Sequence, residues 1–266
     1  MSIARVLVIA GSDSGAGAGI QADVKTVMAL GGYATTAITA ITAQNTRGVS
    51  AALALDSALV VAQIDAILSD IGTDSIKIGM LGNAAIAAAV AARLDRPDAR
   101  RPLVFDPVMV ATSGAVLADA ATIAAFERLM ALATIITPNL PELHALGGSA
   151  EALARRSGAL VLVKGGHGEG PLLTDRLIGP DGEVAAWSGA RIETRHSHGT
   201  GCTLASAIAT GLAAGLPVEA AVGRARDYVR AALAAAPGLG QGHGPLGHRA
   251  GIMTGDYGLA NGGIKS

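Results

Sequence analysis

The sequence contains one cysteine and few aromatic residues: one Trp, three Tyr and two Phe among 266 residues. A lone cysteine cannot form a disulfide within the chain, which fits a reducing compartment. The scarcity of rings for base stacking and the formal net charge of -1 both argue against a nucleic-acid partner. Any anionic ligand is therefore expected to be held locally, by loop amides and a few cations.

Long hydrophobic runs are also missing, although 50% of the residues are hydrophobic. Apolar runs such as residues 6–10 and 160–163 have the length of a strand, whereas a membrane-spanning helix needs roughly 20 apolar residues. The start, MSIARVLVIAGSD, carries Arg5 in a short apolar stretch and lacks a clear cleavage pattern. It predicts a first strand and not a signal peptide. We therefore expect no membrane partner and a cytoplasmic location.

Short apolar runs alternate with alanine-rich segments of helical length, which is typical of an α/β fold with a mainly parallel sheet. Strands are predicted at residues 4–10, 33–42, 75–81, 102–110, 133–137 and 159–164, and helices at 20–30, 57–71, 84–94, 118–132, 203–214 and 218–235. Two extended runs around the turn GPDG, within residues 171–187, predict an antiparallel hairpin added to the sheet. The length fits one domain, predicted at residues 1–248, with a flexible glycine-rich tail at 249–266.

A first glycine-rich segment, GSDSGAGAGI at residues 11–20, follows a predicted strand and opens a predicted helix. Free amides at such a helix start suit an anion or a polar ligand. However, Gly15, Gly17 and Gly19 lack the G-x-G-x-x-G spacing, and no Gly-Lys-Ser/Thr follows, so neither a dinucleotide fingerprint nor a P-loop is predicted. Ligand binding and a tight strand-to-helix connection remain equal alternatives for this segment.

A second glycine turn, Gly199-Thr200-Gly201-Cys202, precedes an apolar run of helical length. Its backbone amides are expected to form an anion hole at the start of that helix. The helix dipole would favour the Cys202 thiolate there, so the cysteine could serve as a base or nucleophile. The alternative is a small buried apolar residue, which is the commoner fate of a free cysteine.

Four polar clusters stand where predicted strands finish: Gln44-Asn45-Thr46, Asp106-Pro107, Asn139-Leu140-Pro141-Glu142 and Lys164-Gly165-Gly166-His167. Ligands of open α/β sheets bind at the carboxyl ends of strands, so these clusters are candidates for one site. Taken singly, Asp106 fits a turn cap, Glu142 the first turn of a helix and Lys164 a solvated strand end. Together they provide what phosphoryl transfer needs, namely oxygen ligands for Mg²⁺ and cations and amides for the phosphate.

The motifs VIAGSDSGAGAGIQADVKT, ITAITAQNT, IKIGMLG, DPVMVATSG, TPNLPEL, VLVKGGH, HGTGCTLASAIA and GHGPLGH follow one another in the chain. In this order, over about residues 4–248, the chain resembles the hydroxymethylpyrimidine/phosphomethylpyrimidine kinases, the thiamine-synthesis branch of the ribokinase superfamily. The resemblance implies a three-layer α/β/α sandwich and a homodimer. It also implies an enzyme that uses ATP and Mg²⁺ to phosphorylate 4-amino-5-hydroxymethyl-2-methylpyrimidine, and then phosphorylates the monophosphate to the diphosphate.

The resemblance also implies a role for the second glycine turn. Most sugar-kinase relatives carry Gly-Ala-Gly-Asp there with the Asp as base, so Cys202 would occupy the base position. In a loose transition state the proton can leave late, and an oriented acceptor is sufficient. The amides of Gly199, Thr200, Gly201 and Cys202 would then surround the transferred phosphoryl group.

Other site residues follow from the same resemblance. Gln44 would read the pyrimidine edge through its paired donor and acceptor. The rest of the substrate pocket would comprise Gly11, Ala18, Asp23, Met80 and Val108. Metal and phosphate contacts would come from Asp106, Glu142, Asn139, Lys164 and Gly201. His198 is expected only to hydrogen-bond the loop.

Two alternatives and two departures accompany this interpretation. A pyridoxal kinase of the same superfamily would use a similar Cys-bearing turn, and a nucleotide-free pyrimidine sensor would retain the pocket without catalysis. Thr112 stands where many relatives have Lys, which predicts weaker phosphate binding at that point. The sequence from Met253 to Asp256 echoes the sugar-kinase turn, but no helix-length apolar run follows it, so it is assigned to the tail.

Overall fold

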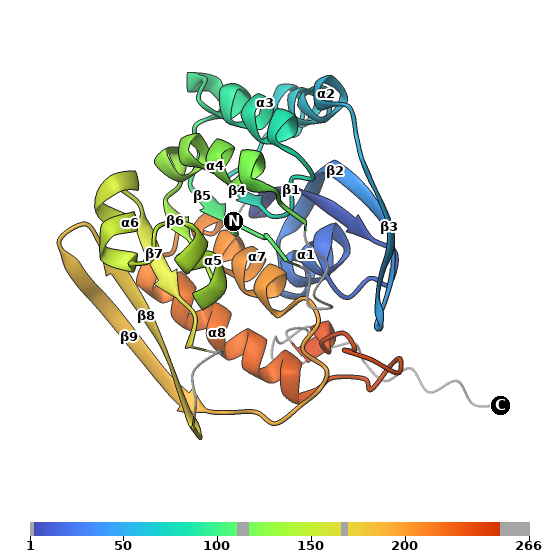
Figure 1. Cartoon of the computed structure of the whole chain (residues 1–266), viewed down its shortest axis with the longest axis vertical. Coiled ribbons are helices and arrows are strands. Elements are labelled where there is room, and N and C mark those ends of the chain that lie inside the picture. The colour runs from blue at the N-terminus through green and yellow to red at the C-terminus, as the bar shows by residue number, and fades with distance from the viewer. Residues whose placement is uncertain (1–2, 111–116, 166–169, 251–266) are drawn as a thin grey trace.

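The computed structural model describes residues 3–110, 117–165 and 170–250, in which strands and helices alternate as predicted (Figure 1). The strands are β1 (Arg5–Asp13), β2 (Tyr33–Asn45), β3 (Gly48–Ala54), β4 (Ser75–Ile78), β5 (Leu103–Phe105), β6 (Ile135–Ile136), β7 (Leu160–Val163), β8 (Leu172–Gly179) and β9 (Gly182–Ala190). The α-helices are α1 (Gly19–Ala29), α2 (Ser57–Ser69), α3 (Ala84–Leu94), α4 (Ala120–Leu132), α5 (Leu140–Ala145), α6 (Ala150–Ser157), α7 (Thr200–Ala213) and α8 (Val218–Ala234), with a 3-10 turn, η1 (Pro97–Ala99).

The strands of the described residues form one sheet in the order β3-β2-β1-β4-β5-β6-β7-β8-β9. Strands β2, β1, β4, β5, β6 and β7 are parallel to one another, whereas β3 pairs antiparallel with β2, β8 with β7, and β9 with β8. The predicted parallel sheet with its antiparallel hairpin is therefore confirmed. The parallel strands end at one edge, which is where a ligand of such a sheet is expected.

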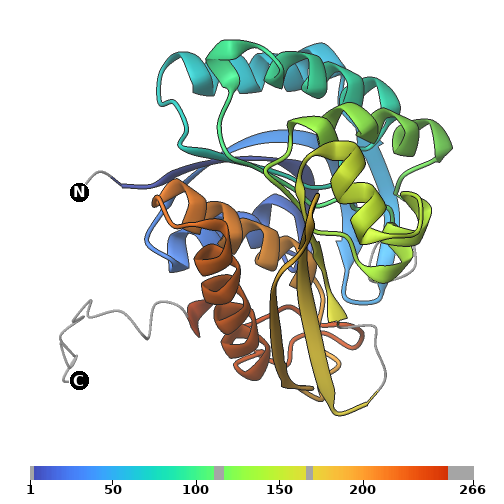
Figure 2. The ribbon, with the colours of Figure 1, turned by 90° about the vertical axis from the view of Figure 1, so that its left-hand side faces the viewer.

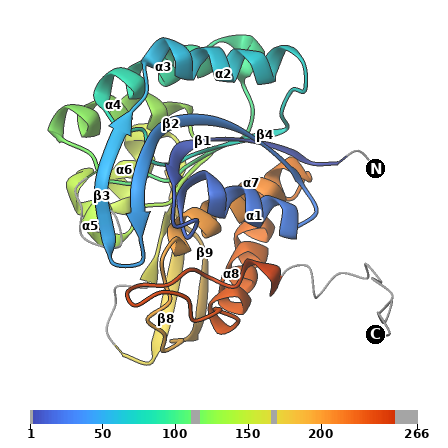
Figure 3. The ribbon, with the colours of Figure 1, turned by 90° about the vertical axis from the view of Figure 1, so that its right-hand side faces the viewer.

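Helices cover both faces of the sheet, as Figures 2 and 3 show. In β1, Leu7 and Ile9 belong to the core under α2, α3, α4 and α6, whereas Val6, Val8 and Ala10 belong to the core under α1, α7 and α8. This alternation follows from the two-residue period of a strand, and both faces are apolar because both are covered. The structure confirms the expected three-layer α/β/α sandwich.

Some short elements were not predicted from the sequence. The edge strand β3 was not predicted, because its sequence GVSAALA is mostly exposed and shows no alternation of polar and apolar residues. The short helix α6 was not predicted either. Helix α5 corresponds to the alternative stated for Glu142, the first turn of a helix, and it begins with a capping box formed by Asn139 and Glu142. Helix α7 begins at Thr200 and not at residue 203, which places Cys202 in its first turn.

Several predictions fall on residues outside those that the structure describes. These include Thr112, His167, Gly166 and the sequence from Met253 to Asp256, and the domain boundary at residue 248 stays a prediction. Within the described ranges, every helix is too short or too polar to cross a membrane.

Candidate active site

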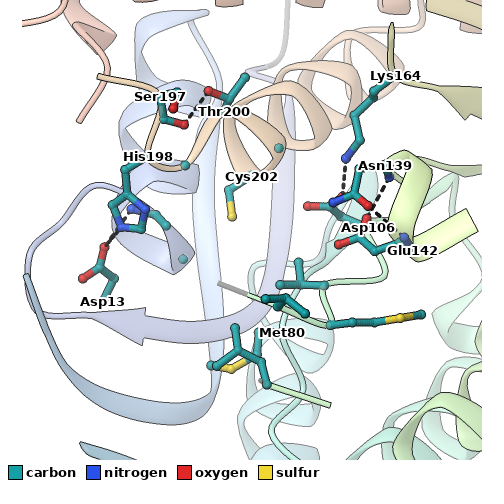
Figure 4. A pocket seen from close by; sticks show the side chains of 18 of the residues that line it. Asp13, Met80, Asp106, Asn139, Glu142, Lys164, Ser197, His198, Thr200 and Cys202 are labelled. Carbon is teal, nitrogen blue, oxygen red and sulfur yellow. Dashed lines mark hydrogen bonds and ion pairs between the residues drawn. The ribbon is translucent and has the colours of Figure 1, made fainter. Parts of the chain in front are cut away.

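A cavity of about 910 Å³ lies at the carboxyl ends of the parallel strands, beside the N-terminus of α7. Its walls include all but one of the predicted site residues: Gly11, Ala18, Gln44, Met80, Asp106, Val108, Asn139, Glu142, Lys164, Gly199, Thr200, Gly201 and Cys202. Residues more than 150 positions apart therefore meet in one site. In Figure 4, Cys202 lies between His198 and Asp13 on one side and Asp106, Asn139, Glu142 and Lys164 on the other.

The second glycine turn has a conformation that glycine alone adopts without strain. Gly199 is the N-cap of α7 and has a φ of 84°, and a Cβ added there would overlap the carbonyl oxygen of Gly17. The first N–H groups of a helix lack partners within it, so this turn presents donors to the cavity. Thr200 is an exception to the expected four amides, because its N–H points to the carbonyl oxygen of Ser197 at 3.3 Å.

The side chain of Cys202 is half-buried, and burial raises the pKa of its thiol to about 11. The positive charge of Lys77 and a backbone hydrogen bond from Gly19 both favour the thiolate, but they do not outweigh the loss of water. The dipole argument from the sequence predicted the opposite direction, because it considered the helix start without its burial. Cys202 is therefore a neutral thiol at pH 7 in this cavity.

An acidic and basic cluster faces Cys202. Asp106, which follows β5, is 2% exposed and accepts a hydrogen bond from Thr137 at 2.9 Å and from the Lys164 ammonium at 3.3 Å. Burial alone would lower the pKa of Lys164, but the charges of Asp106 and Glu142 outweigh it and raise that pKa. Lys164 is therefore a permanent cation, and an added Cβ at Gly201 would lie 3.5 Å from its Nζ.

Glu142 sits in the first turn of α5. Its Oε2 accepts the backbone N–H of Asn139 at 2.8 Å, while Asn139 Oδ1 accepts the N–H of Glu142 at 2.8 Å. Burial raises the pKa of Glu142 to about 7, and the neighbouring charge of Asp106 acts in the same direction against the pull of Lys164. This carboxylate therefore changes charge near neutral pH.

The described residues contain no group of three or more His, Cys, Asp or Glu side chains that could hold a metal by itself. Asp106 and Glu142 nevertheless supply two carboxylates in one wall of the cavity. Mg²⁺ is commonly bound by one or two carboxylates together with water and substrate phosphates. The donor set therefore fits a magnesium ion that arrives with a nucleotide.

Asp23, the remaining predicted pocket residue, does not line the cavity. Its carboxylate is 0% exposed and accepts two hydrogen bonds from Lys77 Nζ, at 2.8 and 3.0 Å, and one from Ser206 at 2.7 Å. Ser206 lies one turn beyond Cys202 on α7, so this ion pair ties α1 and β4 to the helix beneath the glycine turn. Asp23 therefore supports the helix that carries Cys202, and no local sequence pattern indicates its partner Lys77.

The first glycine-rich loop is folded around Asp13. The Asp13 carboxylate accepts hydrogen bonds from the N–H groups of Gly15, Gly17 and Ala18 at 2.8 to 3.0 Å. These three amides are hydrogen-bonded to Asp13, so they are not free donors for a phosphate in this structure. Sequence reasoning missed this central role, which the Asx-type spacing of an Asp two residues before a glycine could have indicated.

The cavity is also lined by Gly11, Gln44, Met80 and Val108. Gly11 makes room for Met80, because an added Cβ would overlap the Met80 methyl group. Other lining residues were not singled out from the sequence, among them Leu173, Arg191, Ile192, Arg230 and Leu233. The lining therefore combines apolar side chains with one amide and a charged cluster.

The chain is similar to characterised kinases. A family model described as phosphomethylpyrimidine kinase matches residues 13–247. A hydroxymethylpyrimidine/phosphomethylpyrimidine kinase of Rhizobium meliloti is 49% identical over 92% of this chain and 97% of that protein. A thiamine biosynthesis bifunctional protein of Geobacter sulfurreducens is 46% identical over 91% of this chain and 52% of that protein. The ADP complex of a Bacillus subtilis pyridoxal kinase is 31% identical, with a TM-score of 0.84 over 96% of this chain and 100% of that chain. By sequence and fold, the chain belongs to the phosphomethylpyrimidine kinase family.

Proposed function

We propose that this protein transfers the γ-phosphoryl group of ATP to the hydroxymethyl group of 4-amino-5-hydroxymethyl-2-methylpyrimidine. It then transfers a second phosphoryl group to the monophosphate, for thiamine biosynthesis. One observation carries the proposal: Lys164 and Asp106 face the glycine turn and Cys202 in a cavity that is also lined by Gln44, Met80 and Val108. The arrangement offers a phosphoryl-transfer centre beside a slot for a small ring.

The phosphate contacts come from Lys164 and the α7 N-terminus. The Lys164 ammonium and the N–H groups of Gly201 and Cys202 would stabilise charge on the transferred oxygens. Asp106 keeps the lysine in place through its 3.3 Å ion pair. This end of the site supplies electrostatic stabilisation without a covalent intermediate.

Asp106 and Glu142 are the residues that would hold Mg²⁺, and Asn139 lies next to them for a phosphate contact. A bound Mg²⁺ would neutralise phosphate charge during the transfer. The adenine end of ATP would lie among the apolar lining residues Leu173, Ile192 and Leu233. The ADP complex of the similar pyridoxal kinase supports ATP as the phosphate donor.

In the reaction, the substrate hydroxyl oxygen bonds to the γ-phosphorus, the bond from that phosphorus to the leaving oxygen breaks, and ADP departs. The hydroxyl proton must leave as well. Because the pKa of the Cys202 thiol is about 11, about 10⁻⁴ of it is thiolate at pH 7 in the empty cavity. We therefore propose that Cys202 orients the hydroxyl, and that its thiolate form alone accepts the proton, late in the transfer, when the hydroxyl oxygen has become acidic.

The pyrimidine would lie against Met80 and Val108, over the gap left by Gly11, with its polar edge toward Gln44. A side-chain amide offers one donor and one acceptor, which matches the ring nitrogen and amino group of a neutral aminopyrimidine. A pyridoxal kinase remains the second candidate, because the similar Bacillus subtilis structure has that activity in its name. A homodimeric, cytoplasmic enzyme stays a prediction from the family resemblance.

The test is ADP release with ATP and Mg²⁺ and four acceptors in parallel: the hydroxymethylpyrimidine, its monophosphate, pyridoxal and ribose. Turnover of the first two is expected. Turnover of pyridoxal alone would replace the proposed substrate, and silence with all four acceptors would favour a sensor. Gln44→Ala should raise the KM for the pyrimidine, while the KM for ATP stays unchanged.

A further inference from the structure

The buried carboxylate of Asp13 determines the hydrogen-bonding role of His198. Asp13 Oδ2 accepts the N–H groups of Gly17 and Ala18 at 3.0 and 2.9 Å, and lies 2.9 Å from Nε2 of His198. Burial would raise the pKa of Asp13, but the His198 and backbone hydrogen bonds outweigh it and lower that pKa. An ionised carboxylate only accepts hydrogen bonds, so His198 Nε2 carries a hydrogen and donates it.

The same ring nitrogen faces the side-chain amide of Gln44. In the structure, Gln44 Nε2 lies 2.9 Å from His198 Nε2, which would place two donors against each other. At its other end, Gln44 Oε1 lies 3.3 Å from the hydroxyl of Thr42, and that hydroxyl gives its one hydrogen to the carbonyl oxygen of Ser12 at 2.9 Å. In this orientation the amide nitrogen faces a donor, and the amide oxygen faces a hydroxyl that has no hydrogen left to donate.

Turning the Gln44 amide by 180° exchanges its oxygen and nitrogen and removes both mismatches. The turn is possible because an amide has nearly the same shape in either orientation. Its oxygen then shares, as a second acceptor, the one Nε2 hydrogen that His198 also gives to Asp13, and its NH₂ group donates to the Thr42 hydroxyl oxygen. After the turn, the amide oxygen keeps one free lone pair and the amide nitrogen keeps one free hydrogen, and these are two sites for hydrogen bonds to a ligand. All of Ser12, Asp13, Thr42, Gln44 and His198 line the cavity, so a ligand can reach these two sites.

We propose that His198, oriented by Asp13, fixes the amide of Gln44 in this turned orientation and so determines which ring edge the enzyme accepts. His198 is a positioning residue, and Gln44 is the residue that contacts the ring. The inference rests on the proposed function, in which Gln44 reads the pyrimidine. The amino group of the substrate would lie on the His198 side of the amide, and the ring nitrogen on the Thr42 side.

A fixed amide has a consequence for substrate choice. The 4-oxo analogue of the substrate carries an N–H and a carbonyl where the 4-amino compound carries a ring nitrogen and an amino group. Its donor faces the amide NH₂, and its acceptor faces the amide oxygen. Because mismatched buried polar groups are left unpaired, we expect the enzyme to prefer the 4-amino compound by at least about a hundredfold in kcat/KM.

The test measures kcat/KM for the two compounds in the wild type and in His198→Ala, which frees the amide to turn. We expect the preference to fall about tenfold or more in His198→Ala, with a higher KM for the 4-amino compound and an unchanged KM for ATP. His196→Ala is the matched control, since His196 lies two residues away and is not among the residues that line the cavity. Its preference should equal that of the wild type.

Thr42→Val provides a second variant, because it removes the acceptor for the amide NH₂ while keeping the side-chain shape. It should also reduce the preference, and it tests the proposal if His198→Ala does not fold. An unchanged preference in the folded variants, with active wild type, overturns the role of His198 and leaves the proposed function intact. A wild type that turns over neither pyrimidine overturns both.

Discussion

Replacement of Glu142 by Gln should stabilise the ligand-free protein and inactivate the enzyme. The folded-state pKa of Glu142 is about 7, above its ordinary value of 4.5. A carboxyl group with a raised pKa contributes stability below 4.5, and that contribution is lost as the pH rises through 7. From these two values, the loss between pH 5 and pH 8 is up to about 2.5 kcal/mol. Gln carries no charge and can still accept the Asn139 N–H, so Glu142→Gln avoids this loss.

The assay is urea unfolding of both proteins at pH 5 and pH 8 without nucleotide. The stability of Glu142→Gln relative to the wild type should increase between the two pH values, by up to about 2.5 kcal/mol. At the same time kcat/KM for ATP with Mg²⁺ should fall, because a proposed metal ligand is removed. A stability difference that does not change with pH would refute the argument from burial and from the charge of Asp106.

Three further predictions concern the support and the reactivity of the α7 start. Asp23→Ala should destabilise the protein by about 3–5 kcal/mol in urea unfolding, because it leaves Lys77 charged and buried. The double variant Asp23→Leu/Lys77→Met should recover most of the lost stability. Equal losses of stability in the two proteins would contradict the account. Gly199→Ala should lower both stability and kcat, because the added Cβ overlaps the carbonyl oxygen of Gly17. Gly215 has nearly the same φ with open space around it, so Gly215→Ala should lower stability by only about 1 kcal/mol and leave kcat unchanged. Similar effects of the two substitutions would show that the close approach of Gly199 to Gly17 is unimportant. The rate of Cys202 alkylation by iodoacetamide should increase about tenfold per pH unit from pH 7 to pH 10, because the thiolate fraction grows at that pace below the raised pKa. A rate that levels off below pH 9 would contradict that pKa.

Much of the site could be predicted from the sequence, because its residues stand in recognisable positions. Asp106 and Lys164 follow short apolar strands, and parallel strands must end at the same edge of the sheet. The glycine turn before Cys202 could be recognised for a similar reason, since an apolar run of helical length follows it. Local pattern and topology were sufficient for these residues.

Other features depend on contacts that a sequence does not display. Asp23 pairs with Lys77, 54 residues away, and nothing local distinguishes such a buried pair from two polar surface residues. His198 meets Asp13 across 185 residues, so the sequence predicted only a hydrogen bond to the loop. The pKa of Cys202 was predicted in the wrong direction because the helix dipole is visible locally, whereas burial arises from the packed core.

The measurement that tests the central claim most directly is ADP release by the purified protein with ATP, Mg²⁺ and 4-amino-5-hydroxymethyl-2-methylpyrimidine, compared with Cys202→Ala under the same conditions. The account predicts turnover by the wild type, with kcat reduced in Cys202→Ala far more than the KM for ATP changes. Absence of turnover by the wild type would contradict the proposed reaction, and equal turnover by both proteins would contradict the role of Cys202.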